Sequence, residues 1–307
     1  MEQHAVVLMS TYNGQQYLTE QLDSIFAQTW QGMITVLIRD DGSKDDTISL
    51  IETYSQMENR KILLYKCVNT GPQRSFLELI RIAEDADYYF FADQDDVWDL
   101  DKLDVAIRAM EQYDVPVSYC SNFRHAHMNL EVYEERALAQ RPKFSPLQII
   151  FYNQIPGCVM GFNRKLMLLL KQLQLVNVMM HDSMALSLAA LCGEVIYDEK
   201  PRITHRIHLA NVVGHGHKKI IPHKWIKEKL MLVLHKENYD LSEMARQFLE
   251  LAGDTVHTEY AADISLLQDY KKSWRNTRLL LKHPDSQGIA WDRTTLSIRF
   301  KIGLRLF

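Results

Sequence analysis

The sequence predicts an α/β fold in which a mostly parallel central sheet is flanked by helices, with a helical extension at the C-terminal end. Through about residue 120, short apolar runs of strand length alternate with segments of helical periodicity, a pattern typical of βαβ units. Three of these runs end in polar or acidic turns, and strand ends are where open α/β sheets bind ligands. After residue 216 the pattern changes to long helical segments.

Composition places the chain among ordinary globular proteins. Of its 307 residues, 47% are hydrophobic and 24% are charged, which excludes disordered and fibrous architectures. A formal net charge of −4 gives no electrostatic reason to expect nucleic acid as a partner. The four cysteines form no CxxC pair, and no apolar stretch reaches the roughly 18 residues of a membrane span. These features predict a cytoplasmic protein that would meet the inner face of the cell membrane only from its surface.

Apolar runs and periodicity assign the individual elements. Strands are expected at residues 5–9, 34–38, 62–65 and 88–92, with helices between them near residues 18–26, 45–56 and 76–83. A helix near 103–110 and a strand at 117–120 follow, and residues 121–145 are polar and irregular. Further on we expect a strand at 157–162, helices at 164–174 and 183–192, and strands at 194–198 and 202–206.

The change of pattern predicts a domain boundary near residue 215. Residues 1–215 would form the catalytic domain and 216–307 a mainly helical extension, with helices at 222–236, 239–252 and 259–282. The basic and aromatic residues of 218–236 suit either a contact with anionic lipid or packing on the core. Residues 296–306 alternate between apolar and polar side chains, which predicts a strand or an extended tail adsorbed to a membrane. The extension is a candidate for membrane-surface or oligomer contact.

An acidic cluster follows the fourth strand. Asp93, Asp95 and Asp96 place three carboxylates within four residues, an arrangement that is costly unless a cation compensates the repulsion. Mg²⁺ and Mn²⁺ prefer carboxylate oxygens and keep positions open for phosphate, so a metal–diphosphate site explains the cluster. The alternative is a solvated turn that caps the next helix, although capping accounts for one aspartate rather than three.

Two other strand ends carry comparable turns. The carboxylate of Asp41, after the second strand, can accept the imide N–H of a uracil or thymine ring, although an Asp-Gly turn is also a common structural feature. Ser10, Tyr12 and Asn13 follow the first strand and offer polar groups and an aromatic ring to a nucleoside, or form an ordinary strand-to-helix turn. The combination of three such turns at successive strand ends favours a nucleotide site.

Four motifs in order resemble those of family-two inverting glycosyltransferases with the GT-A fold. They are the turns at 10–14 and 40–46, Asn-Thr-Gly at 69–71, and Asp-Gln-Asp-Asp-Val-Trp at 93–98. Within that family the resemblance is strongest to bacterial enzymes, often rhamnosyltransferases, that build cell-wall, capsular or O-antigen polysaccharide. Further matches extend it to about residue 214.

The resemblance implies a role for each matching residue of the donor site. Asp96 would bind the metal that bridges the donor diphosphate, and Asp41 would meet the pyrimidine imide. The other residues on the nucleotide and donor side would be Ser10, Tyr12, Asn13, Arg74, Asp93, Asp95 and His208. Arg74 keeps the basic character of its position but is not followed by the family's usual Asn, so one donor contact would differ.

Downstream matches concern the sugar and the acceptor. His181-Asp182 resembles the family's His-Asp-Trp-Tyr motif, whose aspartate is the general base; the aromatic pair is absent here, so acceptor contacts would differ. Residues 157–160 resemble a Gly-Cys-Thr-Met strand near the acceptor side. The segment 205–208, with Asn211 and Gly214, resembles one in which a histidine, here assigned to His208, lies near the diphosphate or metal.

The implied reaction is transfer of a sugar, with rhamnose as a candidate, from a dTDP- or UDP-linked donor with inversion. Asp182 would deprotonate the acceptor hydroxyl, a step that such a base speeds by about 10² to 10⁴. Mn²⁺ or Mg²⁺ on Asp96 would neutralise charge on the leaving nucleoside diphosphate. The acceptor would be a glycan or an undecaprenyl-linked oligosaccharide of bacterial cell-surface polysaccharide synthesis.

Two other functions stay open at this point. A nucleotidyltransferase also combines an α/β sheet with carboxylate-bound metal, although its Gly-rich basic N-terminal loop is absent. The second alternative is a non-catalytic relative that binds a nucleotide sugar or a glycan, having kept the fold and lost the catalytic general base. The presence of Asp96, Asp182 and His208 argues against this alternative. A Rossmann dehydrogenase is disfavoured because no GxGxxG follows the first strand.

Overall fold

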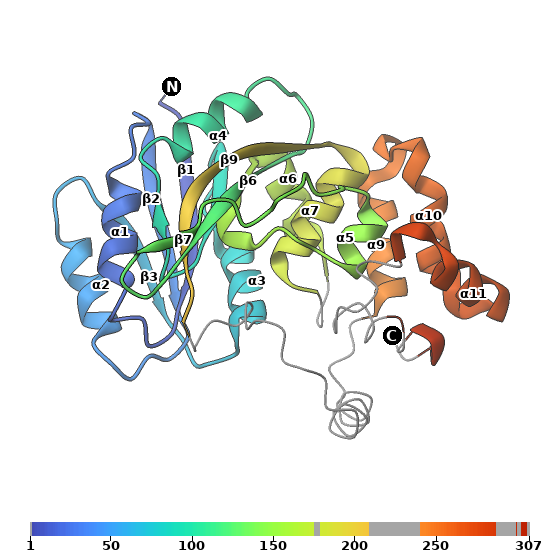
Figure 1. The fold of residues 1–307 in the computed structure, drawn as a ribbon, viewed down its shortest axis with the longest axis horizontal. Helices are drawn as coiled ribbons and strands as arrows, with labels where there is room; N and C mark the ends of the chain where they lie inside the picture. The colour runs from blue at the N-terminus through green and yellow to red at the C-terminus, as the bar shows by residue number, and fades with distance from the viewer. Residues whose placement is uncertain (1, 175–178, 209–239, 287–298, 300–301, 306–307) are drawn as a thin grey trace. The chain divides into compact units, whose positions relative to one another are not determined.

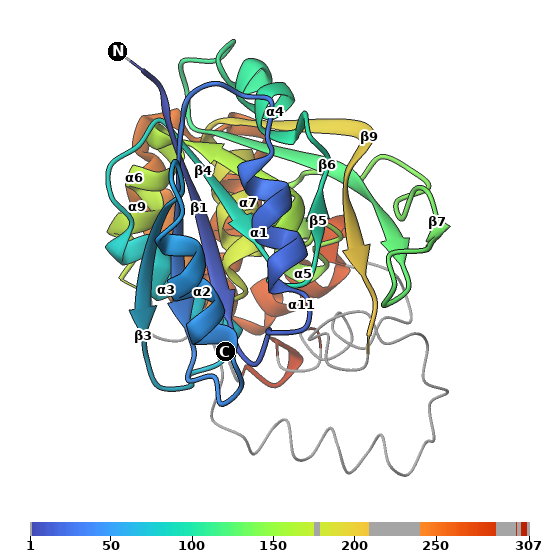
Figure 2. The same ribbon diagram turned by 90° about the vertical axis from the view of Figure 1, so that its left-hand side faces the viewer.

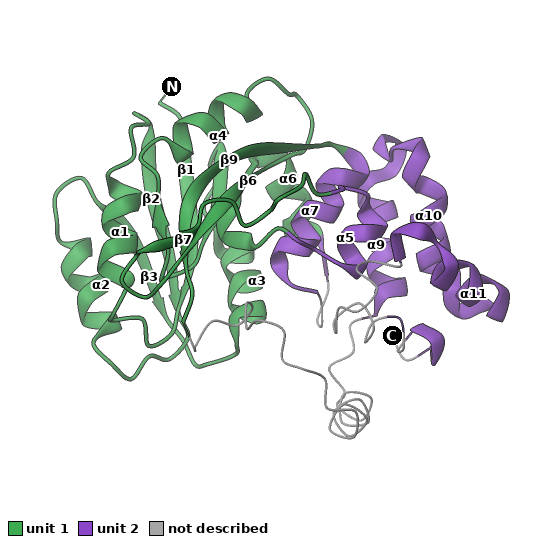
Figure 3. Cartoon of the chain, viewed as in Figure 1, with its two compact units in different colours: residues 1–142, 155–172, 193–208 green, residues 143–154, 173–192, 209–307 purple. Residues whose placement is uncertain are grey.

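The computed structural model describes residues 2–174, 179–208, 240–286, 299 and 302–305 (Figures 1 and 2). The chain divides into two compact units (Figure 3). Unit 1 comprises residues 1–142, 155–172 and 193–208, and unit 2 comprises 143–154, 173–192 and 209–307. The predicted boundary near residue 215 lies outside the described residues, as does the predicted helix at 222–236.

The first half of unit 1 is a parallel sheet covered by three helices (Figure 1). Strands β1 (His4–Thr11), β2 (Met33–Asp40), β3 (Lys61–Lys66) and β4 (Tyr88–Ala92) lie in the order β3-β2-β1-β4, with α1 (Leu18–Phe26), α2 (Thr47–Ser55) and α3 (Pro72–Ile82) between them in sequence. The chain steps outward from β1 to β3 and then returns to β4, so right-handed crossovers place α3 on the opposite face from α1 and α2. With both faces covered, β1 and β4 are continuous apolar runs.

The second half of the sheet contains strands of both directions. β8 (Met160–Asn163) pairs antiparallel with β4 and with β6 (Val117–Ala126), and β9 (Glu194–Arg206) pairs parallel with β6. The short strand β5 (Val97–Trp98) pairs antiparallel with β9, and the short strand β7 (Val132–Glu134) pairs antiparallel with β6. The helical elements of this half are α4 (Lys102–Met110), the 3-10 turn η1 (Gly157–Val159) and α6 (Arg164–Gln172). Because β1 to β4, β6 and β9 share one direction, the predicted mostly parallel sheet is confirmed.

Three expectations for this half are wrong. β6 continues through residues predicted to be irregular, because Asn122 is buried and its side chain bonds the backbone N–H and carbonyl of Leu138 at 3.0 and 2.8 Å instead of facing water. The strands predicted at 194–198 and 202–206 are one strand, β9, whose polar middle accommodates a register shift against β6. Residues 157–159 form the 3-10 turn η1 rather than the start of a strand.

Unit 2 is helical. Its described elements are α5 (Pro146–Phe151), α7 (His181–Cys192), α9 (Leu241–Ala252), η2 (Gly253–Thr255), α10 (Thr258–Asp269), η3 (Tyr270–Lys272), α11 (Trp274–Lys282) and η4 (Pro284–Ser286). Every residue of α7 except Asp182 is buried, so this helix is the core of the unit. The helix predicted at 259–282 is two helices, since the hydroxyl of Ser273 caps α11 by accepting from the N–H of Asn276 at 3.0 Å.

The predicted strand or extended tail at 296–306 is also wrong where the structure describes it. Arg299, Ile302 and Gly303 are helical. Ile302 is fully buried, and the guanidinium group of Arg305 lies 4.1 Å from the centre of the Trp274 ring. These tertiary contacts override the alternating pattern. Among the described residues, no helix combines the length and apolar character needed to cross a membrane.

Candidate active site

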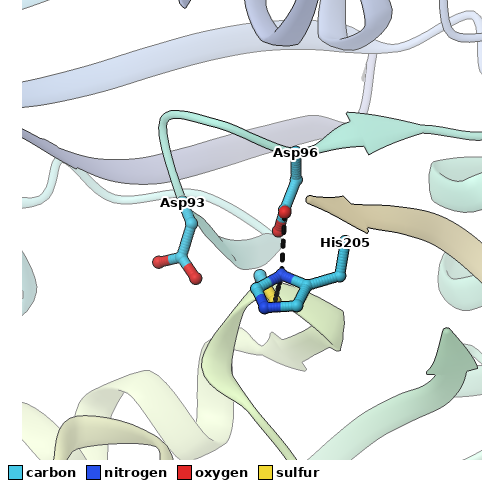
Figure 4. A group of neighbouring side chains, drawn as sticks. Asp93, Asp96 and His205 are labelled. Carbon is cyan, nitrogen blue, oxygen red and sulfur yellow. Dashed lines mark hydrogen bonds and ion pairs between the residues drawn. The ribbon is translucent and has the colours of Figure 1, made fainter. Parts of the chain in front are cut away.

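The acidic turn after β4 meets the end of β9. Pairing of β5 with β9 aligns Val97 with Thr204, which brings the residue before β5 to the residue after Thr204. The Nδ1 atom of His205 lies 2.8 Å from Oδ1 of Asp96, and the backbone N–H of Arg206 donates to the same oxygen at 3.2 Å. Figure 4 shows Asp93 and Asp96 at the two ends of the turn, with the His205 ring beneath Asp96.

These side chains form a group that fits a divalent cation. Asp93, Asp96, Cys158 and His205 each place one ligand atom so that all four lie within 4.8 Å of one another. Asp96 is fully buried, and its second oxygen, Oδ2, has no hydrogen-bond partner among the described residues. A buried carboxylate oxygen without a partner is costly in the absence of a cation. The group therefore suits a metal ion that prefers oxygen and imidazole ligands.

Electrostatics narrow the set of metal ligands. Burial, with the neighbouring carboxylates of Asp96 and Asp93, raises the pKa of the Cys158 thiol well above its usual range, so that side chain stays neutral. Burial opposes ionisation of Asp96, but the charge and hydrogen bond of His205 prevail and lower the pKa of that carboxyl. Burial and the charges of Asp96 and Asp95 raise the pKa of Asp93 to about 7. With the thiol neutral, the carboxylates of Asp93 and Asp96 are the hard oxygen donors of the group, and His205 can add a nitrogen donor only after it loses its proton.

Asp95 faces a different histidine. Its Oδ2 atom lies 2.6 Å from Nε2 of His208, whose ring stacks on Tyr17 with centroids 5.1 Å apart. The prediction put a histidine near the metal or diphosphate and assigned it to His208, but the histidine that contacts Asp96 is His205. The sequence could have indicated His205, because it stands in the same motif as His208, at residues 205–208. The predicted residues Asn211 and Gly214 lie outside the described residues.

The buried guanidinium group of Arg206 holds the acidic turn in place. Its Nε donates to the backbone carbonyl of Asp95 at 2.9 Å, and its other nitrogens bond the Met128 carbonyl and the Glu20 carboxylate. The group also lies 4.4 Å from the centre of the Tyr17 ring. Arg206 therefore joins α1, the acidic turn and the loop after β6.

Replacing Arg206 with methionine is expected to lower the free energy of unfolding by about 2 kcal/mol, because two backbone carbonyls lose a buried donor. Urea unfolding measures the loss. Glu20→Gln is the matched control: this carboxylate is half exposed, so its ion pair with Arg206 contributes less than about 1 kcal/mol. Equal losses in the two variants would show that the turn does not depend on the carbonyl contacts.

The turn after β2 is organised by its two aspartates in different ways. Asp40 accepts from the backbone N–H groups of Gly42 and Ser43 at 3.1 and 2.8 Å, which forms the turn itself. Asp41 is buried and accepts from the N–H groups of Thr70 and Gly71 at 3.0 and 2.8 Å, and it pairs with Arg39. Asp41 thus fixes the 69–71 loop beside its own turn.

The turn after β1 is tied to both of its neighbours. The side chain of Gln94 bonds the backbone of Tyr12 through its carbonyl and amide groups, at 2.9 and 3.1 Å. Asn13, with a φ of 48°, accepts from the N–H of Lys44 at 2.8 Å. The hydroxyl of Ser10 donates to that of Ser75 at 2.6 Å, at the start of α3. The predicted motifs at 10–14, 40–46, 69–71 and 93–96 therefore come together at one edge of the sheet.

Two predicted residues of the donor side are exposed there. The Tyr12 side chain is 47% exposed, so its ring is open to a ligand. Arg74 is exposed in the first turn of α3, and no ion pair joins it to the other described residues. Trp98, by contrast, is buried against Phe90, and the ammonium group of Lys102 lies 3.7 Å from the centre of its ring.

Lys102 is a buried neighbour of the acidic turn that the sequence did not reveal. Its side chain is fully buried, and its ammonium group donates to the carbonyl of Cys158 at 2.7 Å. Burial lowers the pKa of Lys102 to about 7, against the opposing charges of neighbours that include Asp96 and Asp93. A basic group thus lies below the acidic turn, where it offsets part of the carboxylate repulsion.

Asp182 lies in unit 2, at the first turn of α7, and is partly exposed. Its Oδ1 atom accepts from the N–H and the hydroxyl of Ser183, at 2.5 and 3.2 Å. The preceding His181 is buried, and burial lowers its pKa to about 3, so the imidazole is neutral. Among the predicted site residues that the structure describes, Asp182 alone belongs to this unit.

The fold and the site define an α/β protein with a ligand site at the topological switch point of its sheet. The strand order reverses between β1 and β4, and ligands bind open sheets in the crevice outside such carboxyl ends. The turns that carry Tyr12 and Asp93 follow these two strands, and Asp41 follows β2 beside them. The site is therefore at the position that this class of fold uses.

Comparison with known proteins identifies the family. The family model described as glycosyl transferase family 2 matches residues 6–166, more than half of the chain, so the chain belongs to this family. The dTDP-rhamnosyl transferase RfbG of Shigella flexneri is 29% identical over 221 residues, covering 67% of this chain and 73% of that protein. The predicted family resemblance is confirmed, and the nucleotidyltransferase alternative is set aside.

Solved structures support the predicted GT-A-type fold. TarS 1–349 of Staphylococcus aureus, in complex with UDP-GlcNAc, superposes with a TM-score of 0.55 at 16% identity, covering 93% of this chain and 77% of that one. The mannosyltransferase PcManGT of Pyrobaculum calidifontis, in complex with GDP-Man and Mn²⁺, gives 0.53 at 16% identity and covers 98% and 75%. At these identities the similarity concerns the fold alone.

Proposed function

We propose that this family 2 glycosyltransferase is a divalent-metal-dependent, inverting hexosyltransferase that uses a nucleoside-diphosphate sugar. The observation that carries the proposal is Asp96, a fully buried carboxylate that contacts His205 and leaves one oxygen without a partner among the described residues. Its neighbours Asp93 and Asp95 face the same edge of the sheet. The presence of Asp96, Asp182 and His208 argues against a non-catalytic relative.

Asp93, Asp96 and His205 would hold the metal, Mn²⁺ or Mg²⁺. The two carboxylates supply the oxygen ligands that these hard cations prefer, and such cations leave positions open for phosphate oxygens. When bound, such an ion supplies positive charge that stabilises a departing diphosphate. The Mn²⁺ in the complex of PcManGT, a protein of similar fold, supports this assignment. Arg206 holds the acidic turn through the carbonyl of Asp95, and Lys102 bonds the carbonyl of Cys158, another member of the group.

The nucleoside would bind at the turns after β1 and β2. Tyr12 offers an exposed ring, Arg74 an exposed cation, and Asn13 and Ser10 polar groups beside them. Asp41 would lie at the edge of the pyrimidine ring, together with the 69–71 loop whose N–H groups it binds. Asp95, with His208, would face the donor ribose. The similarity to RfbG supports dTDP-rhamnose as the donor, with UDP-sugars as the other choice.

Asp182 would be the base on the acceptor side. Its carboxylate lies in the first turn of α7, and Ser183 orients it by donating hydrogen bonds to one of its oxygens. It would take the proton of the acceptor hydroxyl as that oxygen attacks the anomeric carbon. The acceptor we propose is a glycan or an undecaprenyl-linked oligosaccharide of bacterial cell-surface polysaccharide, made on the cytoplasmic side of the membrane.

A donor panel tests the proposal. The protein is incubated with Mn²⁺ and dTDP-, UDP- and GDP-sugars, and nucleoside diphosphate release and thermal shift are recorded. We expect one donor class to raise the melting temperature and to be consumed, with NMR showing an inverted anomeric configuration in the product. Failure of every nucleotide to shift the melting temperature, together with no donor consumption, would contradict it.

A further inference from the structure

Helix α11 of unit 2 has a basic and aromatic outer face. Trp274, Arg275, Arg278, Leu279 and Lys282 are all exposed, and their spacing places them on one side of the helix. Thr277 and Leu280, on the other side, are buried. The helix has no acidic residue, and the Trp274 side chain is 67% exposed. The outer face of α11 therefore combines an indole ring, which also contacts the guanidinium group of Arg305, with several cations.

A pocket opens beside this face. Its volume is about 320 Å³, and it is lined by Trp274, Arg278, Lys282 and Arg299, with Thr277, Leu281 and Gly303. Arg299 is positioned by a hydrogen bond to the carbonyl of Ser286 at 2.9 Å. None of the lining residues is acidic. The pocket thus gathers three cations and one indole ring, which suits a phosphate group attached to an apolar body.

Basic side chains near α11 in the sequence and on α9 form ion pairs with acidic residues of the same unit. Arg246 on α9 pairs with Glu243 and Glu250 of the same helix, and Lys272 pairs with Asp269. For Arg275 and Arg278, the described part of the chain supplies no ion-pair partner. Within the described residues, the charges of Arg275 and Arg278 are therefore not neutralised, whereas that of Arg246 on α9 is.

We propose that α11 and its pocket dock on the surface of a bilayer rich in anionic phospholipid. Headgroup phosphates would contact Arg275, Arg278 and the pocket, while Trp274 and Leu279 enter the boundary between headgroups and acyl chains. Amphipathic helices with basic and aromatic residues bind membranes in this way, and each cation near such a surface contributes to attraction. A soluble phosphate compound would explain the cations but not the exposed Trp274 and Leu279.

Vesicle co-sedimentation tests this surface with the full chain. Vesicles of phosphatidylcholine mixed with phosphatidylglycerol are compared with vesicles of phosphatidylcholine alone. We expect binding only to the anionic vesicles, and its loss at about 0.5 M salt, where charges are screened. Arg275→Glu with Arg278→Glu should weaken binding by more than roughly 30-fold, because the loss of two cations near the surface alone accounts for about 30-fold and the two new carboxylates are repelled in addition. Trp274→Ser should weaken binding to the anionic vesicles and leave its dependence on salt unchanged.

The matched control reverses two exposed cations of unit 1, Arg141→Glu with Lys200→Glu, which makes the same change in net charge. This variant should bind anionic vesicles nearly as the wild type does. Far-ultraviolet circular dichroism checks that each variant is folded, as expected for exposed positions. The proposal would be overturned if both double variants lost vesicle binding equally, or if the charge reversal at Arg275 and Arg278 left binding unchanged. Equal binding of the wild type to neutral and anionic vesicles would overturn it as well. Donor binding is measured separately and should not change.

Discussion

Replacing Asp96 with asparagine is expected to abolish Mn²⁺ binding and to reduce sugar transfer by about 10³-fold or more, because metal stabilisation of a leaving group is worth several kcal/mol. Asparagine preserves the shape of the side chain and an oxygen for the N–H of Arg206, but removes the charge. Calorimetric titration with Mn²⁺ measures binding without donor, and initial rates measure transfer.

The control for this variant is Asp99→Asn. Asp99 is three residues away and pairs with Arg124 at 2.8 and 2.9 Å, outside the group that would bind the metal. It should bind Mn²⁺ as the wild type does. Undiminished Mn²⁺ binding by Asp96→Asn would remove Asp96 from the metal site, and equal loss in Asp99→Asn would indicate a general effect of charge.

Replacing Asp182 with asparagine is expected to slow transfer by about 10² to 10⁴, the range typical of a lost general base. Asparagine can still accept the hydrogen bond from the N–H of Ser183, so the first turn of α7 is retained. Because Asp182 lies outside the unit that contains the donor-site residues, the dissociation constant of the nucleotide should not change. Single-turnover rates and nucleotide titration separate the two effects.

Asp254→Asn is the control for this second variant. Asp254 is an exposed carboxylate of the same unit, in η2, so the chemical change is the same at a position with no proposed role. Its transfer rate should equal that of the wild type. A wild-type rate in Asp182→Asn would end the assignment of the base, and a weakened nucleotide affinity in that variant would give Asp182 a different role.

The sheet was predictable because its signals are local. The run from Tyr88 to Ala92 consists of five buried residues, as expected for a central strand covered on both faces. The turns at 10–14, 40–46 and 93–96 each follow a strand of the same direction, so parallel pairing alone brings them to one edge. The sequence could therefore place these three turns at one edge of the sheet.

The contact between Asp96 and His205 was not predictable in the same way. It joins residues 109 positions apart and depends on the register of a two-residue strand, β5, against β9. The burial of Lys102 and Arg206 in the same region depends on tertiary packing, since both residues look like ordinary surface cations in the sequence. The helical tail around Ile302 likewise follows from contacts with α11 rather than from its alternating pattern.

Metal dependence tests the central claim most directly. The protein is depleted of metal with a chelator, given the donor identified in the panel and an acceptor, and assayed before and after Mn²⁺ is added. If Asp93, Asp96 and His205 hold an ion that stabilises the leaving diphosphate, product will form only after Mn²⁺ is restored, and Asp96→Asn will stay inactive. Equal rates of transfer in chelator and in Mn²⁺ would contradict the account.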